Sequence, residues 1–269
     1  MTLNQRPFSF LLLIALSLLL LITAGCKTRR FPTEQAPELH INWARETPES
    51  LLKSMRHRAQ GLATFTAYFQ INMDPPPAKM PSSFSGIIYL SKDGENTRLR
   101  IKAFHLFGAT LFDMVAQEGV TKVYIPSKQT LYVGKTDKKQ QEAAQGPQEI
   151  FSSLMINFND LKILPGSSLI IGKDTVKLPL IDGEMRFDKK TGHILSLIEP
   201  DKKTIYSDYQ KLAPNYPAMP TDIQLTSSLG KARCRLKEIT IYQTMGQENF
   251  DLSSYQVKKI KALSEAGKE

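Results

Sequence analysis

The chain has 269 residues and a formal net charge of +9, which comes from 35 Lys and Arg residues against 26 Asp and Glu residues. The basic residues are spread along the sequence, and few aromatic residues alternate with them, so a nucleic-acid-binding protein is disfavoured. Only two cysteines are present, which excludes a framework of disulfide bonds within the chain.

The N-terminus carries an uncharged apolar run, FSFLLLIALSLLLLITA, at residues 8–24. Such a short run near the N-terminus, followed by small residues, is typical of a secretory signal. The pair Ala24-Gly25 directly before Cys26 is typical of bacterial lipoprotein signals, which are cleaved before a cysteine that is diacylated on sulfur. We therefore predict a lipoprotein signal peptide over residues 1–25 and lipidation of Cys26. An ordinary signal peptide and an uncleaved anchor helix, with Cys26 incidental, remain the alternatives.

Residues 26–42 are predicted to form a lipidated tether, because this stretch contains Pro and shows no periodicity. Each buried methylene contributes about 0.8 kcal/mol, so two or three acyl chains would hold the protein firmly. Lys27, Arg29 and Arg30 would then lie against lipid headgroups. Lys27 also stands where enterobacterial inner-membrane lipoproteins carry Asp. The tether therefore points to the periplasmic face of the outer membrane of a Gram-negative bacterium.

The first helix is expected within residues 43–61. Thr47 and Pro48 are a favourable N-cap and first helical residue, and Gly61 is a favourable stop. The spacing places one apolar stripe along this helix, so it should lie against a sheet. The stripe consists of Leu51, Leu52, Met55 and Ala59.

From Leu62 onwards the apolar residues recur with a period of two, and polar turns separate the segments, which is typical of an antiparallel meander. The strands expected before a polar break are 64–73, 84–92, 98–104, 110–117, 120–127 and 130–134. Those expected after it are 174–181, 184–189, 193–199, 203–210, 221–228 and 231–243. The tail 246–269 is polar towards its end and is expected to fray.

A second helix is predicted after Pro147, over residues 148–158. Its apolar face would consist of Ile150, Phe151, Leu154, Met155 and Phe158. A single sheet of about eleven strands must curl to bury its apolar face. We therefore predict a mainly β (α+β) domain over residues 43–245. Its architecture would be an unclosed antiparallel β-barrel, with an N-terminal helix and an inserted lid helix over an apolar hollow.

Catalytic and metal-binding patterns are missing from the sequence. The histidines at 40, 57, 105 and 193 show no metal-binding spacing with another His or Cys. Neither a Gly-x-Ser-x-Gly elbow nor a Gly-rich phosphate loop followed by a helix occurs. We therefore expect a protein that is not an enzyme and that needs no metal and no cofactor.

Two single residues within strands allow more than one interpretation. Asp113 is a lone carboxylate in an apolar strand, and an outward-facing position is favoured over a buried functional acid. Cys234 alternates in phase with Ala232 and Leu236, which favours a buried, inert thiol.

The turn between two strands, FHLFGAT (104–110), is unusually apolar. Turns favour Gly, Asn, Asp and Ser, and Gly108 alone fits that pattern. An exposed Phe107 would insert into lipid or into the path of an acyl chain. Alternatively, these side chains plug the mouth of the barrel. The two possibilities are balanced for Leu106, whereas insertion is favoured for Phe107.

Two stretches carry a resemblance to a known family. Residues 97–134, TRLRIKAFHLFGATLFDMVAQEGVTKVYIPSKQTLYVG, and residues 216–242, YPAMPTDIQLTSSLGKARCRLKEITIY, resemble the outer-membrane lipoprotein receptor LolB and its relatives. The resemblance covers most of residues 43–243, with PAMP at 217–220 as its clearest match. It implies an unclosed barrel that accepts lipoprotein acyl chains and releases the lipoprotein into the outer membrane.

The resemblance also implies partners and a membrane-facing turn. The partners would be acylated lipoproteins handed over by a periplasmic LolA-like carrier, with membrane lipid holding Cys26 and the protein acting as a monomer. The family's protruding turn, PLG, maps its Leu onto Phe107 and its Gly onto Gly108, with Leu106 in place of Pro. A carrier of free lipid or glycolipid and a structural envelope-assembly lipoprotein are the alternative functions.

The lipoprotein signal generates a first prediction. Replacing Cys26→Ala removes the sulfur that would carry the acyl chains, so the protein should remain unprocessed or be released from the membrane. Cell fractionation and the mass of the product check this outcome. A cleaved Cys26→Ala protein that still fractionates with the outer membrane would contradict the anchor.

Overall fold

The computed structural model describes residues 41–60, 64–76, 81–93, 96–135, 158, 160–212, 218–228 and 230–265. The predicted signal peptide, Cys26 and most of the tether lie outside these residues. Of the predicted second helix, only Phe158 is described, so Ile150, Phe151, Leu154 and Met155 lie outside them as well.

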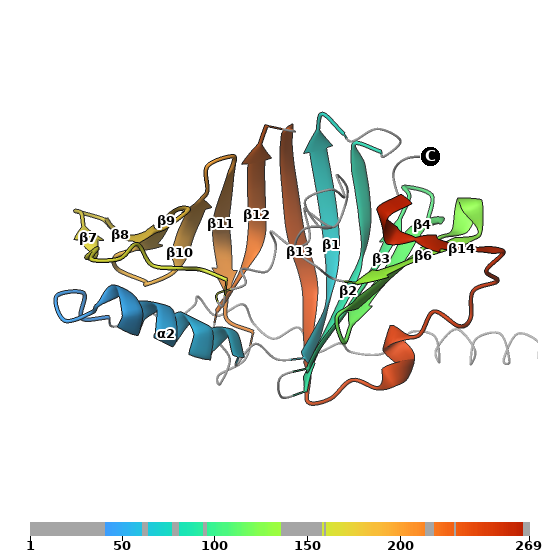
Figure 1. Ribbon diagram of the computed structural model, residues 1–269, viewed down its shortest axis with the longest axis horizontal. Helices are drawn as coiled ribbons and strands as arrows, with labels where there is room; N and C mark the ends of the chain where they lie inside the picture. The colour runs from blue at the N-terminus through green and yellow to red at the C-terminus, as the bar shows by residue number, and fades with distance from the viewer. Residues whose placement is uncertain are drawn as a thin grey trace, which may run out of the picture. The chain divides into compact units, whose positions relative to one another are not determined.

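The described residues form one sheet of 14 strands (Figure 1). The strands are β1 (Thr64–Asp74), β2 (Ser83–Asp93), β3 (Asn96–Phe104), β4 (Thr110–Gln117), β5 (Val120–Ile125), β6 (Thr130–Lys135), β7 (Ile170–Ile171), β8 (Thr175–Leu180), β9 (Gly183–Asp188), β10 (Ile194–Ile198), β11 (Lys202–Gln210), β12 (Met219–Ser227), β13 (Gly230–Tyr242) and β14 (Lys259–Ala262). The helical segments are α2 (Pro48–Gln60) and the 3-10 turns η1 (Pro126–Lys128), η2 (Gln247–Phe250) and η3 (Leu263–Glu265).

The strand order shows how the chain builds this sheet. It runs β14-β6-β5-β4-β3-β2-β1-β13-β12-β11-β10-β9-β8-β7, so the two outermost strands, β14 and β7, do not pair with each other. Two meanders, β1 to β6 and β7 to β13, are joined where β1 pairs with β13, from Thr64 opposite Tyr242 to Asp74 opposite Lys231. The prediction of a mainly β, unclosed antiparallel sheet is confirmed.

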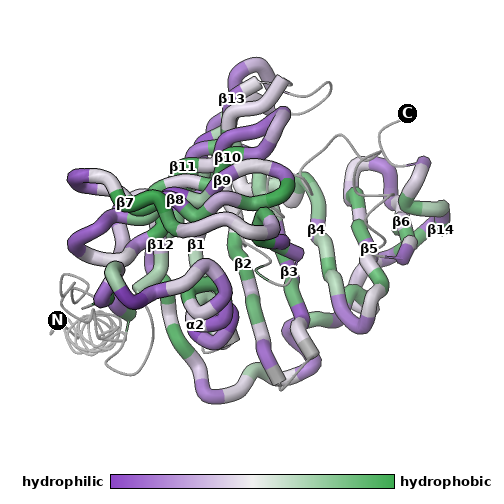
Figure 2. The backbone as a smooth tube through the Cα atoms, turned by 60° about the vertical axis from the view of Figure 1, so that its left-hand side comes forward, coloured by the Kyte–Doolittle hydropathy of each residue, from purple (hydrophilic) through white to green (hydrophobic). Residues whose placement is uncertain are grey.

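The predicted strands all occur, with ends that differ by at most two residues. The period of two located them because one face of each strand is buried, as in β1, whose odd-numbered residues from Phe65 to Met73 are buried. Figure 2 shows the curl of the sheet and the alternation of hydrophobic and hydrophilic residues along its strands. Two strands were not predicted: β7, which has two residues, and β14.

Helix α2 confirms the first predicted helix, and its N-terminus is capped by side chains. The Ser50 amide donates to Thr47 Oγ1 at 3.1 Å, and the Thr47 amide donates to Ser50 Oγ at 3.0 Å. This reciprocal arrangement satisfies two backbone donors that a helix start leaves free. Leu51, Leu52 and Met55 are buried, as the predicted apolar stripe requires.

The expectation that the chain frays from Gly246 onwards is wrong for residues 246–265. This segment packs against the outer face of the sheet, the face opposite to α2, where Phe250 and Leu252 join Val115 and Tyr124 in one cluster. It ends in β14, which pairs with β6 in parallel, so the sheet is not wholly antiparallel. The apolar residues of this segment recur without a regular period, which is why its packing was missed.

Asp113 points to the outer face of the sheet, as the sequence favoured, but the structure buries it there. Its side chain is fully buried, with 0% exposure, under the C-terminal segment. Arg100 Nε donates to Asp113 Oδ1 at 2.9 Å and Arg100 Nη2 to Oδ2 at 2.6 Å, and the Tyr255 hydroxyl donates to Oδ2 at 2.7 Å. Burial and the neighbouring Asp113 raise the pKa of Tyr255 to about 12. Asp113 therefore faces away from α2 but not into water.

Asp113 generates a second prediction. Removing one partner of a buried ion pair leaves the other charge uncompensated, so Asp113→Asn should lower the free energy of unfolding by about 3 kcal/mol. Residues 246–265 should also become more sensitive to limited proteolysis. The control is Asp182→Asn at an exposed turn, which should change stability by less than about 0.5 kcal/mol. Equal stability of the two variants would contradict the buried pair.

Candidate functional site

The inner face of the sheet, defined as the face on which α2 packs, is the main candidate. A first apolar cluster contains Phe69, Ile71 and Cys234, and a second contains Tyr206, Ile223 and the α2 residues Leu51 and Met55. Ile223 of the second cluster lies directly opposite Cys234 of the first, so both clusters share this face. The inner face is therefore one apolar surface that runs across the joined meanders.

Aromatic rings organise the first cluster. Phe69 and Phe84 meet edge to face with centroids 6.1 Å apart, and Phe84 and Phe112 are also 6.1 Å apart. Gly86 makes room for them, because a Cβ there would lie 2.2 Å from the Lys102 carbonyl oxygen and 2.6 Å from the Phe69 ring. The buried members of this cluster come from β1, β2, β3, β4 and β13, and none comes from a helix that the structure describes.

Side chains that point to the inner face of β1 to β4 are apolar along most of each strand, as the alternation in register with Phe69 and Phe84 requires, and the charged exception is Lys92 at the end of β2, in phase with Leu90. The apolar side chains are Phe65, Ala67, Phe69, Ile71, Met73, Phe84, Ile88, Leu90, Leu99, Ile101, Ala103, Phe112, Met114 and Ala116. Cys234 confirms its prediction, since it is buried on this face and burial raises the pKa of its thiol to about 12. This half of the inner face is suited to apolar groups.

Helix α2 is fastened over the other half of the inner face. Trp43 Nε1 donates to the Lys189 carbonyl oxygen at 2.7 Å, which anchors the segment before the helix. Arg56 Nε donates to the Phe158 carbonyl oxygen at 3.1 Å. Phe158, the one described member of the predicted lid face, lies in a turn and packs against the second cluster. The helix is thereby held to the β8 to β12 part of the sheet.

The apolar turn at 105–109 is the second candidate. Leu106 is 76% exposed and Phe107 is 91% exposed, so neither side chain plugs the barrel mouth. The turn is tight, because the Gly108 amide donates to the His105 carbonyl oxygen at 2.8 Å and Gly108 has a φ of +81°. That conformation favours glycine. The His105 ring stacks on Phe107 with centroids 5.7 Å apart.

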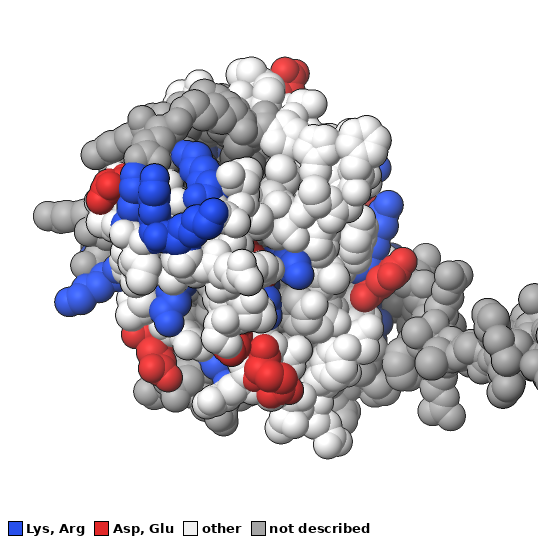
Figure 3. All heavy atoms as spheres, turned by 90° about the vertical axis from the view of Figure 1, so that its right-hand side faces the viewer, with Lys and Arg blue, Asp and Glu red and all other residues white. Residues whose placement is uncertain are grey.

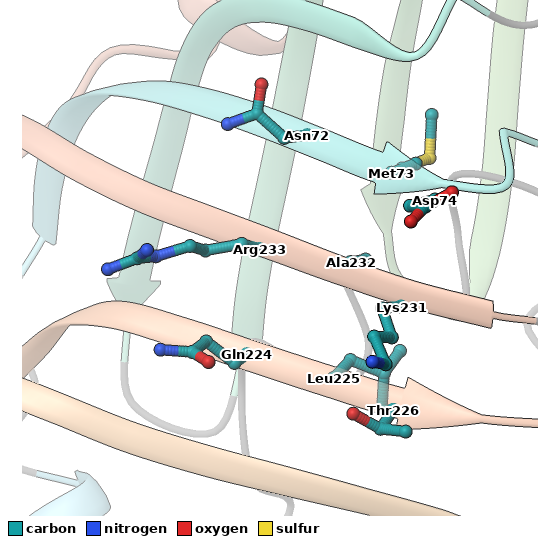
Figure 4. A pocket seen from close by; sticks show the side chains of 9 residues that line it. All are labelled: Asn72, Met73, Asp74, Gln224, Leu225, Thr226, Lys231, Ala232 and Arg233. Carbon is teal, nitrogen blue, oxygen red and sulfur yellow. The ribbon is translucent and has the colours of Figure 1, made fainter.

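A groove of about 270 Å³ lies where β1, β13 and β12 run side by side (Figure 4). The residues that line the groove are consecutive along each strand and so point alternately to the two faces of the sheet. They include the polar residues Asn72, Gln224 and Lys231. Arg233, which also borders it, is engaged by Asp222, with Nε to Oδ1 at 2.9 Å and Nε to Oδ2 at 3.0 Å. This mixed polar lining does not suit an apolar ligand, so the groove is a weaker candidate than the inner face.

Within the described residues, no group of three or more His, Cys, Asp or Glu side chains could hold a metal ion. The described part of the chain also has no helix that is both long enough and apolar enough to cross a membrane. The predicted membrane-facing residues Leu106, Phe107 and Gly108 are brought together by one turn, whereas the predicted lid face lies almost entirely outside the described residues.

The buried Arg100–Asp113–Tyr255 contact and the lysines of β14 were not identified from the sequence. A signal for β14 exists, because KIKA at residues 259–262 alternates basic and apolar residues, but its length alone does not separate a strand from a tail. For Asp113, the diagonal position of Arg100, which is paired with Val115, becomes visible only once the register of β3 and β4 is known.

The exposed turn generates a third prediction. Phe107→Glu should change the free energy of unfolding by less than about 0.5 kcal/mol, because the side chain already lies in water. The contrasting variant is Phe84→Ala on the inner face, where Phe84 is 1% exposed, and it should cost about 3–5 kcal/mol. Chemical denaturation of both variants measures the difference. A large loss of stability in Phe107→Glu would mean that the turn packs in solution.

Comparisons with known proteins find structures with a similar fold but no protein with a similar sequence. No protein-family model matches the chain, and no curated protein matches it in sequence. A solved lipoprotein-sorting protein domain of the outer membrane from Vibrio parahaemolyticus, itself described as putative, is similar, with 10% identity and a TM-score of 0.51. The match covers 77% of this chain and 98% of that one.

Two further structures extend the likeness. A DUF1329 family protein from Desulfovibrio piger has 13% identity and a TM-score of 0.57 over 78% of this chain and 98% of its own. A LolA superfamily protein from Nitrosomonas europaea has 12% identity and a TM-score of 0.50 over 77% of this chain and 99% of its own. At such low identity the likeness establishes a shared fold, the unclosed barrel, and nothing about activity.

Proposed function

We propose that this protein is an envelope lipoprotein that binds the acyl chains of other lipoproteins on its inner face and helps to insert them into the outer membrane. The observation that carries the proposal is the apolar inner face of β1 to β4, which is continuous with the cluster under α2. The fold shared with a lipoprotein-sorting protein domain and a LolA superfamily protein supports it.

The inner face matches the chemistry of an acyl chain. Each methylene moved from water to such a surface contributes about 0.8 kcal/mol, and the gain does not depend on direction. Aromatic and aliphatic side chains therefore suffice for binding, and no charged group is needed. Because no bond is made or broken, the transfer of a chain from a carrier to a bilayer requires no catalytic residue and no cofactor.

Delivery requires contact with the bilayer, and the turn at 105–109 is the part we assign to it. Phe107 and Leu106 project from the end of β3, adjacent in sequence to the apolar face that would hold the cargo. Burying one such side chain in lipid contributes roughly 1.5–3 kcal/mol, which is useful and still reversible. Phe107 would open the lipid surface while the acyl chain leaves the inner face.

The remaining assignments follow from the sequence. Cys26 would carry the acyl anchor after removal of residues 1–25, which places the protein on the periplasmic face of the outer membrane. A LolA-like periplasmic carrier would supply the acylated lipoproteins, and Phe158 with its predicted helix would contribute to the lid. A carrier of free lipid or glycolipid would use the same inner face, because an apolar face does not distinguish a free lipid from the acyl chains of a lipoprotein.

Complementation in the native host tests the function and generates a fourth prediction. Depletion of the protein should leave outer-membrane lipoproteins in the periplasm, and wild-type protein should restore their sorting. Phe107→Glu should be present at normal levels and fail to restore it, because a charge enters hydrocarbon at high cost.

The matched control is Leu164→Glu, which introduces the same charge at another exposed apolar residue, 45% exposed and remote in sequence from the turn. This variant should restore sorting. Normal lipoprotein sorting during depletion, combined with a loss of free lipid from the outer membrane, would replace the proposal by the free-lipid carrier. Normal distribution of both would reject the two together.

A further inference from the structure

Other segments lie at the same end of the sheet as the turn at 105–109, and the proposed function assigns no role to them. β4 begins directly after the turn, and β5 runs antiparallel to β4 with Tyr124 opposite Asp113. The chain therefore leaves β5 at the end where β4 begins, and η1 lies there beside β4. η1 includes Lys128, which is exposed.

β14 starts at the same end of the sheet. Lys259 lies opposite Thr130, the first residue of β6, in the parallel pair of β14 and β6. The amides of Lys258 and Lys259 both donate to the Gln129 carbonyl oxygen, at 2.9 Å and 3.3 Å. Both lysine side chains are exposed, and Ile260 beside them is 73% exposed.

We call the surface formed by Lys128, Lys258, Lys259 and Ile260 the basic edge. It belongs to two segments that carry basic side chains: residues 120–135 contain three Lys and residues 252–264 contain three more, and the acidic residues nearest to the second segment are Asp251 and Glu265. Figure 3 shows a group of Lys and Arg side chains on this side of the molecule, with separate Asp and Glu side chains on the same face. The apolar turn 105–109 next to the basic edge has no acidic residue.

Aromatic stacking and hydrogen bonds hold the segment that precedes Lys258 against the sheet. The Tyr124 and Tyr255 rings stack with centroids 4.3 Å apart, and the Tyr124 hydroxyl donates to the Gln256 carbonyl oxygen at 3.3 Å. Tyr255 is further held by its hydrogen bond to buried Asp113. Tyr255 and Gln256, which precede Lys258 by three and two residues, are therefore fixed to β4 and β5, and this holds in place the backbone that leads into Lys258 and Lys259.

We propose that the basic edge is a second membrane contact, which binds the phosphate groups of anionic lipid headgroups while Phe107 and Ile260 enter the acyl boundary. Lysine is a compact positive charge with three donors and suits phosphate, and nearby apolar side chains strengthen binding at an interface. The inference rests on the proposed function in taking a bilayer as the place of delivery. The inference adds that the protein prefers membranes that contain anionic lipid. Binding of this lipid to the basic edge would orient the turn at 105–109 towards the membrane.

Docking of the basic edge to a membrane can be tested without a cargo lipoprotein, with the full chain reconstituted into lipid vesicles. Ser127 of η1 is exposed, so Ser127→Cys provides a site for an environment-sensitive fluorophore. Acylated Cys26 would have no free thiol, and buried Cys234, whose pKa is raised to about 12, would not compete for the label. The emission should shift to shorter wavelength in phosphatidylcholine vesicles that contain phosphatidylglycerol and not in phosphatidylcholine alone. High salt should reduce the shift, because it screens exposed charges.

The charge reversal Lys258→Glu with Lys259→Glu should lower the ratio of docked to undocked protein about tenfold or more, given the attraction of each lysine to an anionic surface. The matched control is Lys162→Glu with Lys173→Glu, which makes the same change in net charge at two exposed lysines outside the basic edge. The control should dock like the parent protein.

Three results would overturn the proposal. The emission does not depend on phosphatidylglycerol, or both double variants lose docking equally, or docking survives the reversal of Lys258 and Lys259 while lipoprotein sorting in cells is lost. The last result would assign the basic edge to an acidic protein partner. Because no cargo lipoprotein is present in the vesicle assay, a failure of acyl-chain transfer would leave its outcome unaffected and would count against the proposed function alone.

Discussion

The pairing of β1 with β13 is the contact on which the rest of the structure depends. It joins strands that are far apart in the sequence and turns two meanders into one sheet, so that the cluster around Phe69 and the cluster around Ile223 become a single inner face. Without this pairing, each meander would expose an edge strand and an apolar face of its own. The joined sheet is instead left open at β7 and β14, which gives the curled surface that we assign to acyl chains.

The two faces of the sheet are used differently. The inner face is apolar and contacts α2 over β8 to β12, whereas the outer face of β3 to β6 is covered by the C-terminal segment through Asp113, Arg100 and Tyr255. A buried ion pair adds little net stability but is costly to break, so it favours one arrangement of the segment over others. That arrangement places the exposed Lys258 and Lys259 and the apolar turn at one end of the sheet, the end for which we propose contact with a membrane.

The sequence by itself determined the class of the fold and most of its elements. Alternation with a period of two located the strands of both meanders, because each has one buried face, and the Thr47-Pro48 pair located the start of α2 through local backbone chemistry. The turn at 104–110 was also recognisable, since large apolar residues in a tight turn conflict with local turn preferences. The lipid anchor at Cys26 and the lid face around Leu154 stay predictions, because they lie outside the described residues.

The features that only the tertiary structure decided depend on contacts between residues that are far apart in the sequence. Asp113 has the same local sequence whether it faces water or Tyr255, and only the packing of residues 246–265 over β4 buries it. β14 is too short to be a strand by pattern, and it becomes one because β6 offers a free edge. The exposure of Phe107 and Leu106, and their position at the end of the sheet that carries Lys258, follow from register and not from spacing. A local pattern specifies which face a residue takes, whereas only the assembled sheet specifies what covers that face.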